Sequence, residues 1–94
     1  MQFDAKVLFV RQPDVVACEL GTGMALLNMQ EGKYYRLNDT AKLIWDQLEQ
    51  PSSVGSLVDS IVKRFEIGVA ECTSDVIAVV TKLCEDNLVR QYSA

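Results

Sequence analysis

Apolar and polar residues alternate along three short ranges between Asp14 and Leu37, and this period of two predicts β-strands. Between the ranges lie Gly21-Thr22-Gly23 and Gln30-Glu31-Gly32, whose residues favour tight turns. A chain that reverses twice in this way forms an antiparallel meander. The predicted strands are Asp14 to Leu20, Met24 to Met29 and Lys33 to Leu37, and Val7 to Val10 forms a further extended piece.

The strand at Lys33–Leu37 runs into a helix without a spacer. Along this strand, Tyr35 and Leu37 share one face, and Tyr34 and Arg36 share the other. The next three residues can all accept a hydrogen bond from the first turn of a helix. They are Asn38, Asp39 and Thr40.

Helical spacing of apolar residues predicts three helices in the rest of the chain. The first runs from Asp39 to Glu49 and ends before Pro51, and Ser53 caps the second. The third ends at Asn87, with Thr73 or Ser74 as its N-cap, and Leu88-Val89 returns as a short extended wing. The second helix carries Leu57, Val58, Ile61, Val62 and Phe65, and the third carries Cys72, Val76, Val79, Val80 and Leu83. We therefore predict a winged-helix-like α+β fold, with a three-stranded antiparallel sheet followed by three helices.

The composition is that of one soluble domain covering residues 1–94, with 49% hydrophobic and 23% charged residues. No apolar run approaches the roughly 20 residues of a membrane span. Met1–Lys6 lacks the apolar region of a signal peptide, so we expect a cytoplasmic protein. Cys18, Cys72 and Cys84 are widely spaced among apolar neighbours and are expected to be buried free thiols.

The chain contains no histidine and no CxxC pair, so we expect no metal site, no cofactor and no catalytic residues. Two function classes suit the predicted shape: nucleic-acid binding through the third helix, or peptide binding at a sheet edge. Charge separates them, because that helix holds Glu71, Asp75, Glu85 and Asp86 against Lys82 alone. The net charge is −4. Nucleic acid is therefore a disfavoured partner, although a winged-helix DNA-binding regulator stays the alternative.

Several stretches together resemble the PqqD-like family, whose members are peptide chaperones also called RiPP recognition elements. The resemblance rests on Leu26-Leu27-Asn28, Gly32-Lys33-Tyr34-Tyr35-Arg36-Leu37-Asn38, Ile44-Trp45 with Leu48, Pro51-Ser52-Ser53-Val54, and Asn87-Leu88-Val89. It extends from about Asp14 to Val89 and is closest to the stand-alone members of lasso-peptide gene clusters. Two positions depart from the family pattern, with Asn87 where glycine is usual and Ser56 where an acidic residue is common.

The resemblance implies that the leader of a ribosomally made precursor peptide adds as a strand beside Lys33–Leu37. The module would present it to a transglutaminase-like leader peptidase and an ATP-dependent macrolactam synthetase, without chemistry of its own. A detached adaptor of another peptide-modifying enzyme is a further alternative, and the free edge also allows a homodimer. The expected peptide-binding residues are Lys33, Tyr34, Tyr35, Arg36, Leu37, Asp75, Val76, Val79 and Leu83.

Six of these nine residues also have a purely structural interpretation. Val76, Val79 and Leu83 could belong to the core, and Asp75 could act only as a first-turn helix charge. Tyr35 and Leu37 could pack only inward, which would leave the strand backbone alone as the site.

Overall fold

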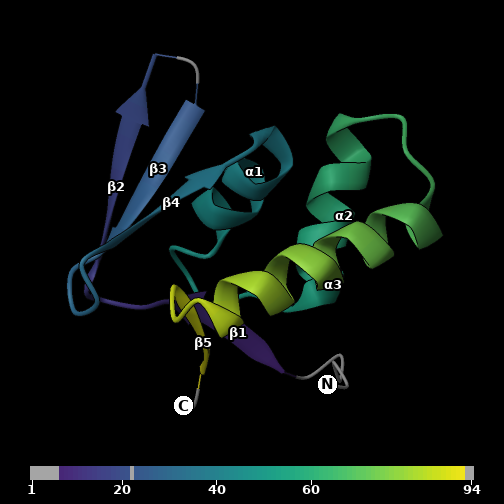
Figure 1. The fold of residues 1–94 in the computed structure, drawn as a ribbon. Helices are drawn as coiled ribbons and strands as arrows, with labels where there is room; N and C mark the ends of the chain where they lie inside the picture. Colours follow the sequence, from purple (N-terminus) through teal and green to yellow (C-terminus); the bar gives the residue numbers. More distant parts are fainter. Residues whose placement is uncertain (1–6, 22, 93–94) are drawn as a thin grey trace.

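A computed structural model describes residues 7–21 and 23–92 of the chain (Figure 1). The elements in chain order are β1 (Leu8–Arg11), β2 (Val15–Leu20), β3 (Gly23–Asn28), β4 (Lys33–Leu37), α1 (Asp39–Gln47), α2 (Val54–Arg64), α3 (Val69–Glu85) and β5 (Val89–Tyr92). The predictions for Met1–Lys6 and for Thr22 lie outside the described residues.

The predicted meander is confirmed: β2, β3 and β4 form an antiparallel sheet in the order β2-β3-β4. Val16 pairs with Leu27, which pairs with Tyr34, so these side chains share one face of the sheet. Gly32 in the turn before β4 has φ of 67°, a left-handed conformation that glycine adopts at little steric cost.

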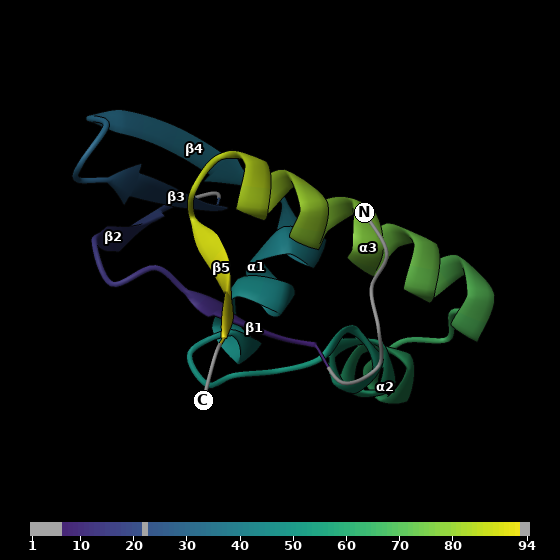
Figure 2. The same cartoon turned by 90° about the horizontal axis from the view of Figure 1, so that it is seen from below.

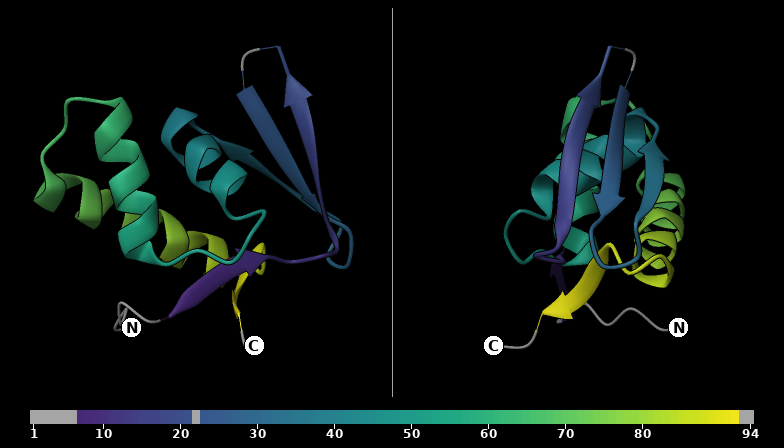
Figure 3. Two further views of the ribbon diagram at one scale, coloured as in Figure 1. Left: turned by 180° about the vertical axis from the view of Figure 1, so that it is seen from behind. Right: turned by 60° about the vertical axis from the view of Figure 1, so that its left-hand side comes forward.

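The two faces of this sheet have different environments. Met24 and Leu26 of β3 are buried in the core, whereas Val16 and Leu20 of β2 lie on the other face and are 46% and 43% exposed. Figure 3 shows the helices on one side of the sheet only. Cys18 is also exposed, so the prediction of a buried thiol is wrong there, because no layer of the described chain covers this edge strand. The other two cysteines are buried or half-buried.

β1 and β5 form a second, two-stranded antiparallel sheet, which lies below α1 and α3 in Figure 1 and in front of α1 in Figure 2. Leu8 pairs with Tyr92 and Arg11 with Val89, so the two ends of the described chain meet. Extended structure near both ends was predicted from the sequence, but this pairing was not. The backbone of the fully buried Phe9 exchanges two hydrogen bonds with Ser52, at 2.8 and 2.9 Å, which joins this sheet to the segment before α2.

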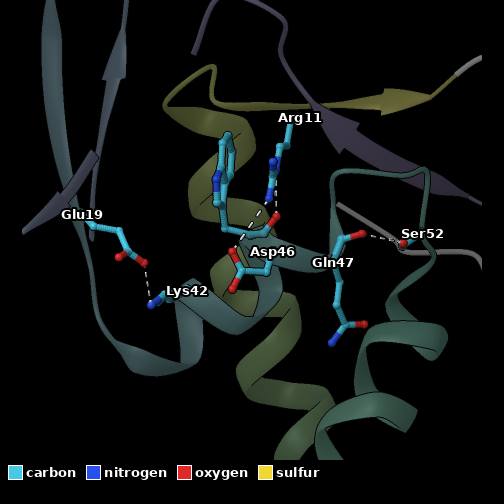
Figure 4. A network of polar contacts seen from close by, with 7 residues as sticks. Arg11, Glu19, Lys42, Asp46, Gln47 and Ser52 are labelled. Atoms are coloured by element: carbon cyan, nitrogen blue, oxygen red, sulfur yellow. Dashed lines mark hydrogen bonds and ion pairs between the residues drawn. The ribbon is translucent and has the colours of Figure 1, made fainter. Parts of the chain in front are cut away.

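Trp45 lies in the core and is only 1% exposed. The guanidinium carbon of Arg11 lies 4.6 Å from its ring centroid, and Arg11 Nε donates to the carbonyl oxygen of Trp45 at 2.8 Å (Figure 4). On the other side of α1, Lys42 Nζ lies 3.2 Å from Glu19 Oε1 of β2. α1 is therefore attached to both sheets.

The first two helices begin where their capping residues predicted. Asn38 Oδ1 accepts from Ala41 N at 2.8 Å before α1, and Ser53 Oγ caps α2. The N-cap predicted for the third helix at Thr73 or Ser74 is wrong, because Gly68 is the N-cap residue and α3 begins at Val69. Thr73 Oγ1 instead donates to Val69 O at 2.7 Å, so it is satisfied inside the helix.

Candidate functional site

β4 is an edge strand, since β3 is its only strand neighbour in the described chain. Alternate residues of an antiparallel strand direct their N–H and C=O groups to opposite sides, so part of the β4 backbone points away from the sheet. The end of β4 is fixed where Asn38 caps α1. The strand therefore presents a positioned row of backbone donors and acceptors.

An open groove with a volume of about 510 Å³ lies between β4 and α3, which Figure 3 shows side by side. Leu83 and Leu88 are almost completely buried and form an apolar floor together with the half-buried Val79. The residues that line the groove are Tyr34, Tyr35, Arg36, Leu37 and Asn38, then Ala41 of α1, then Ala78, Val79, Lys82, Leu83, Asp86 and Leu88. This groove therefore combines a strand edge with an apolar floor.

Charges of both signs lie along the walls of the groove. Arg36 lies on β4, and Lys82 Nζ lies 3.6 Å from Asp86 Oδ1 at the end of α3. The Lys82 side chain is largely exposed, so a bound group can compete for it without a large desolvation cost. A positively or a negatively charged group of a bound molecule could therefore form an ion pair in this groove.

Tyr35 provides a neutral donor in the same groove. Partial burial raises the pKa of its hydroxyl, and the negative charges of Glu31 and Asp86 raise it further. The hydroxyl donates to Glu31 Oε2 at 3.5 Å. Tyr35 therefore stays protonated at neutral pH and acts as a hydrogen-bond donor.

Hydrogen bonds join the β3–β4 turn to the end of α3. Asn28 Nδ2 donates to Asn87 O at 3.2 Å, and Asn87 Nδ2 donates to Glu31 Oε1 at 3.0 Å. Asn87 has φ of 58°, and Leu88 N donates to Leu83 O, which closes α3 with a left-handed residue. We call Asn28, Glu31 and Asn87 the clasp, because they hold the two walls of the groove together at one end.

The groove brings together six of the nine residues predicted for peptide binding: Tyr34, Tyr35, Arg36, Leu37, Val79 and Leu83. Lys33 is exposed at the start of β4 but does not line the groove. Val76 is fully buried in the core and does not line the groove, so its role in peptide binding stays a prediction. Asp75 lies beside a separate pocket and falls in the second turn of α3, because the helix starts earlier than predicted.

Several lining residues were not predicted from the sequence. Ala78, Lys82 and Asp86 recur every four residues, so helical spacing could have placed them beside Val79 and Leu83. Asn38, Ala41 and Leu88 reach the groove only through the tertiary fold, and no local pattern indicates them.

The described residues form neither a metal site nor a membrane-spanning helix. Across residues 7–21 and 23–92, no three His, Cys, Asp or Glu side chains gather closely enough to hold a metal ion. In the same ranges, no helix has the length and apolar character needed to cross a membrane.

Comparisons with known proteins agree with this geometry. The model of the family described as "Coenzyme PQQ synthesis protein D (PqqD)" matches residues 23–89. The solved structure "Lasso peptide synthetase B1 complexed with the leader peptide" is 29% identical, with a TM-score of 0.78 over 87% of this chain and 96% of that chain. "TbiB1 in Complex with the TbiA(beta) Leader Peptide" has the same fold, with 22% identity and a TM-score of 0.79 over 90% and 99% of the two chains. No curated protein matches the chain.

The family match includes β3, β4, all three helices and the beginning of β5. It spans more than half of the chain and agrees with the motifs around β4 that suggested the resemblance. The chain therefore belongs to the PqqD-like family.

Proposed function

We propose that this protein binds the leader segment of a ribosomally synthesised precursor peptide as an added strand beside β4. The observation that carries the proposal is the free edge of β4 next to an apolar-floored groove. The similar lasso peptide synthetase B1 is complexed with a leader peptide, which supports the same class of ligand here.

Strand addition explains how binding can tolerate variation in leader sequence. A peptide paired along the five residues of β4 forms about four ladder hydrogen bonds, each contributing about 1 kcal/mol. These bonds use backbone groups alone. Side chains of the peptide alternate in direction, so every second one would face the floor at Val79 and Leu83. Selectivity would come from these inward residues and from the charges of Arg36, Lys82 and Asp86.

The bound leader would be presented to separate enzymes in the cytoplasm. We propose a transglutaminase-like leader peptidase and an ATP-dependent macrolactam synthetase as the partners, with no chemistry by this chain. The same free edge could pair two copies of the protein. A homodimer formed in this way would compete with the leader for β4.

Fluorescence anisotropy with a labelled leader from the precursor gene beside this chain's gene tests the proposal. Saturable binding at micromolar protein is expected. Val79→Asp places a carboxylate on the groove floor and should weaken binding at least about tenfold. Ile77→Asp is the matched control, because Ile77 is also partly buried on α3 but does not line the groove. Circular dichroism establishes that both variants fold.

Leaders methylated at single backbone nitrogens test the mode of binding. Methylation removes one donor, so affinity should fall at every second position along the paired segment. No saturable binding of the unmodified leader would refute the proposed function. Binding without this alternation would refute strand addition.

A further inference from the structure

A second pocket, with a volume of about 160 Å³, lies beyond the groove where the end of α2 approaches α1 and α3. Its apolar wall includes Phe65, which is 49% exposed, and the half-buried Leu43 and Ile67. Ile67 N donates to Phe65 O at 2.9 Å, so both side chains are held in the short connection between α2 and α3. The residues lining it are Asp39, Thr40, Leu43, Ile61, Phe65, Ile67, Cys72, Asp75 and Val76.

Two carboxylates at this pocket lack a counter-charge. Asp39 lies in the first turn of α1 and Asp75 on α3, and both are exposed. Neither forms an ion pair with the described residues, and no lysine or arginine lines the pocket. A ligand that brings a positive charge beside an apolar group would therefore complement this pocket.

The pocket continues the line of the groove along the same helices. On α3 the groove is lined from Ala78 onward and the pocket by Val76 and the residues before it. The two sites also adjoin at the start of α1, where the N-cap residue Asn38 lines the groove and Asp39 lines the pocket. From Cys72 to Lys82 the axis of α3 rises about 15 Å, which an extended peptide covers in about five residues. One polypeptide can therefore occupy both sites.

We propose that the pocket receives a segment of the leader flanking its paired strand, with an apolar side chain in the pocket and a neighbouring Lys or Arg at Asp39 and Asp75. This inference rests on the proposed function and adds a second recognition site to it. The groove would hold the leader largely by its backbone. The pocket would select leaders that carry a basic and apolar pair at the right distance.

The test compares the wild-type protein with Asp39→Asn/Asp75→Asn, using the same leader whole and shortened stepwise from each end. The double variant should bind the whole leader about fivefold more weakly, the effect of roughly 1 kcal/mol for exposed charge pairs. Shortening from one end removes the apolar contact as well as the charge, so it should weaken wild-type binding by more than this factor and remove the difference between the two proteins. The affinity of the wild type for the whole leader should also fall more steeply with salt concentration than that of the double variant.

Matched variants control for net charge and for lost apolar surface. Glu49→Gln/Glu85→Gln removes the same charge at exposed positions that line neither site and should leave affinity unchanged. Phe65→Ser should weaken binding of the whole leader but not of the shortened one, and Val69→Ser is its exposed control.

The outcomes separate the two proposals. If Asp39→Asn/Asp75→Asn binds every leader length as the wild type does while Val79→Asp weakens binding, the pocket is not a leader site and the proposed function stands. If the variant is equally weakened for whole and shortened leaders, the inference is also overturned. If the wild type binds no leader, both proposals fail.

Discussion

Replacing Asn28 by alanine should destabilise the turn that holds the groove together. Asn28 is a buried polar residue with 4% exposure. Its Oδ1 accepts from Gln30 N at 3.0 Å and from Glu31 N at 3.1 Å. Its Nδ2 donates to Asn87 O at 3.2 Å, so one side chain forms hydrogen bonds with backbone groups of both the β3–β4 turn and the end of α3.

The magnitude follows from these three hydrogen bonds. Each contributes about 0.5–1.5 kcal/mol, and alanine would leave three partly buried backbone groups without their side-chain partner, so we expect a loss of about 2–4 kcal/mol. For a domain of this size, such a loss lowers the melting temperature by roughly 10–25 °C. Leader affinity should also fall, because the walls of the groove would no longer be fixed to each other.

Urea unfolding followed by far-ultraviolet circular dichroism and by Trp45 fluorescence measures this loss. Gln30→Ala is the matched control in the same turn, because the one side-chain bond that Gln30 makes with the described residues is exposed, to Asp14 at 2.8 Å. The control should lose less than about 0.5 kcal/mol. A loss below about 1 kcal/mol for Asn28→Ala would refute the reasoning, since the turn would then hold without its side-chain bonds.

Two further predictions concern the core and the thiols. Arg11→Ala removes the cation–π contact and the bond to Trp45 O, so it should lower the free energy of unfolding by about 1–2 kcal/mol and alter Trp45 fluorescence. Arg11→Lys should recover only part of the lost stability. An unchanged urea midpoint for Arg11→Ala would contradict this prediction. Burial raises the pKa of the Cys72 and Cys84 thiols, so their contribution to stability should be complete below about pH 8.5 and be lost as pH rises further. Urea midpoints from pH 7 to 10 measure this loss of stability. The midpoint of Cys72→Ala/Cys84→Ala should fall less with pH than that of the wild type. An equally steep fall in both proteins would show that the thiols do not cause it.

The parts of the fold that could be predicted from the sequence are those determined by neighbouring residues. The turn at Gly32 and the caps at Asn38 and Ser53 each need only local backbone geometry, and all three are present. The start of α3 could not be placed in this way. Thr73 is a good capping residue, but its hydroxyl can equally bond back within a helix, as it does here.

Pairing between distant segments had no local signal at all. Leu8 and Tyr92 pair across almost the whole chain, and the sequence showed only that both ends can be extended. Helical spacing identified the apolar face of α3. It could not show which of those residues lie in the core, in the groove or at the second pocket, because that depends on which other elements cover each turn of the helix. Val76 is therefore core, Val79 lines the groove and Asp75 lies at the second pocket.

The groove has both of its walls fixed by contacts within the protein. β4 is held by its pairing with β3 and by the helix cap at Asn38, and α3 is closed by Asn87 in its left-handed conformation. The clasp then joins the two walls through side-chain bonds to Glu31 and Asn87. Binding a disordered leader costs conformational entropy, and a wall that also had to order would add to that cost. Because the strand edge is already positioned, the ordering cost falls on the peptide, and a short paired segment can suffice for binding.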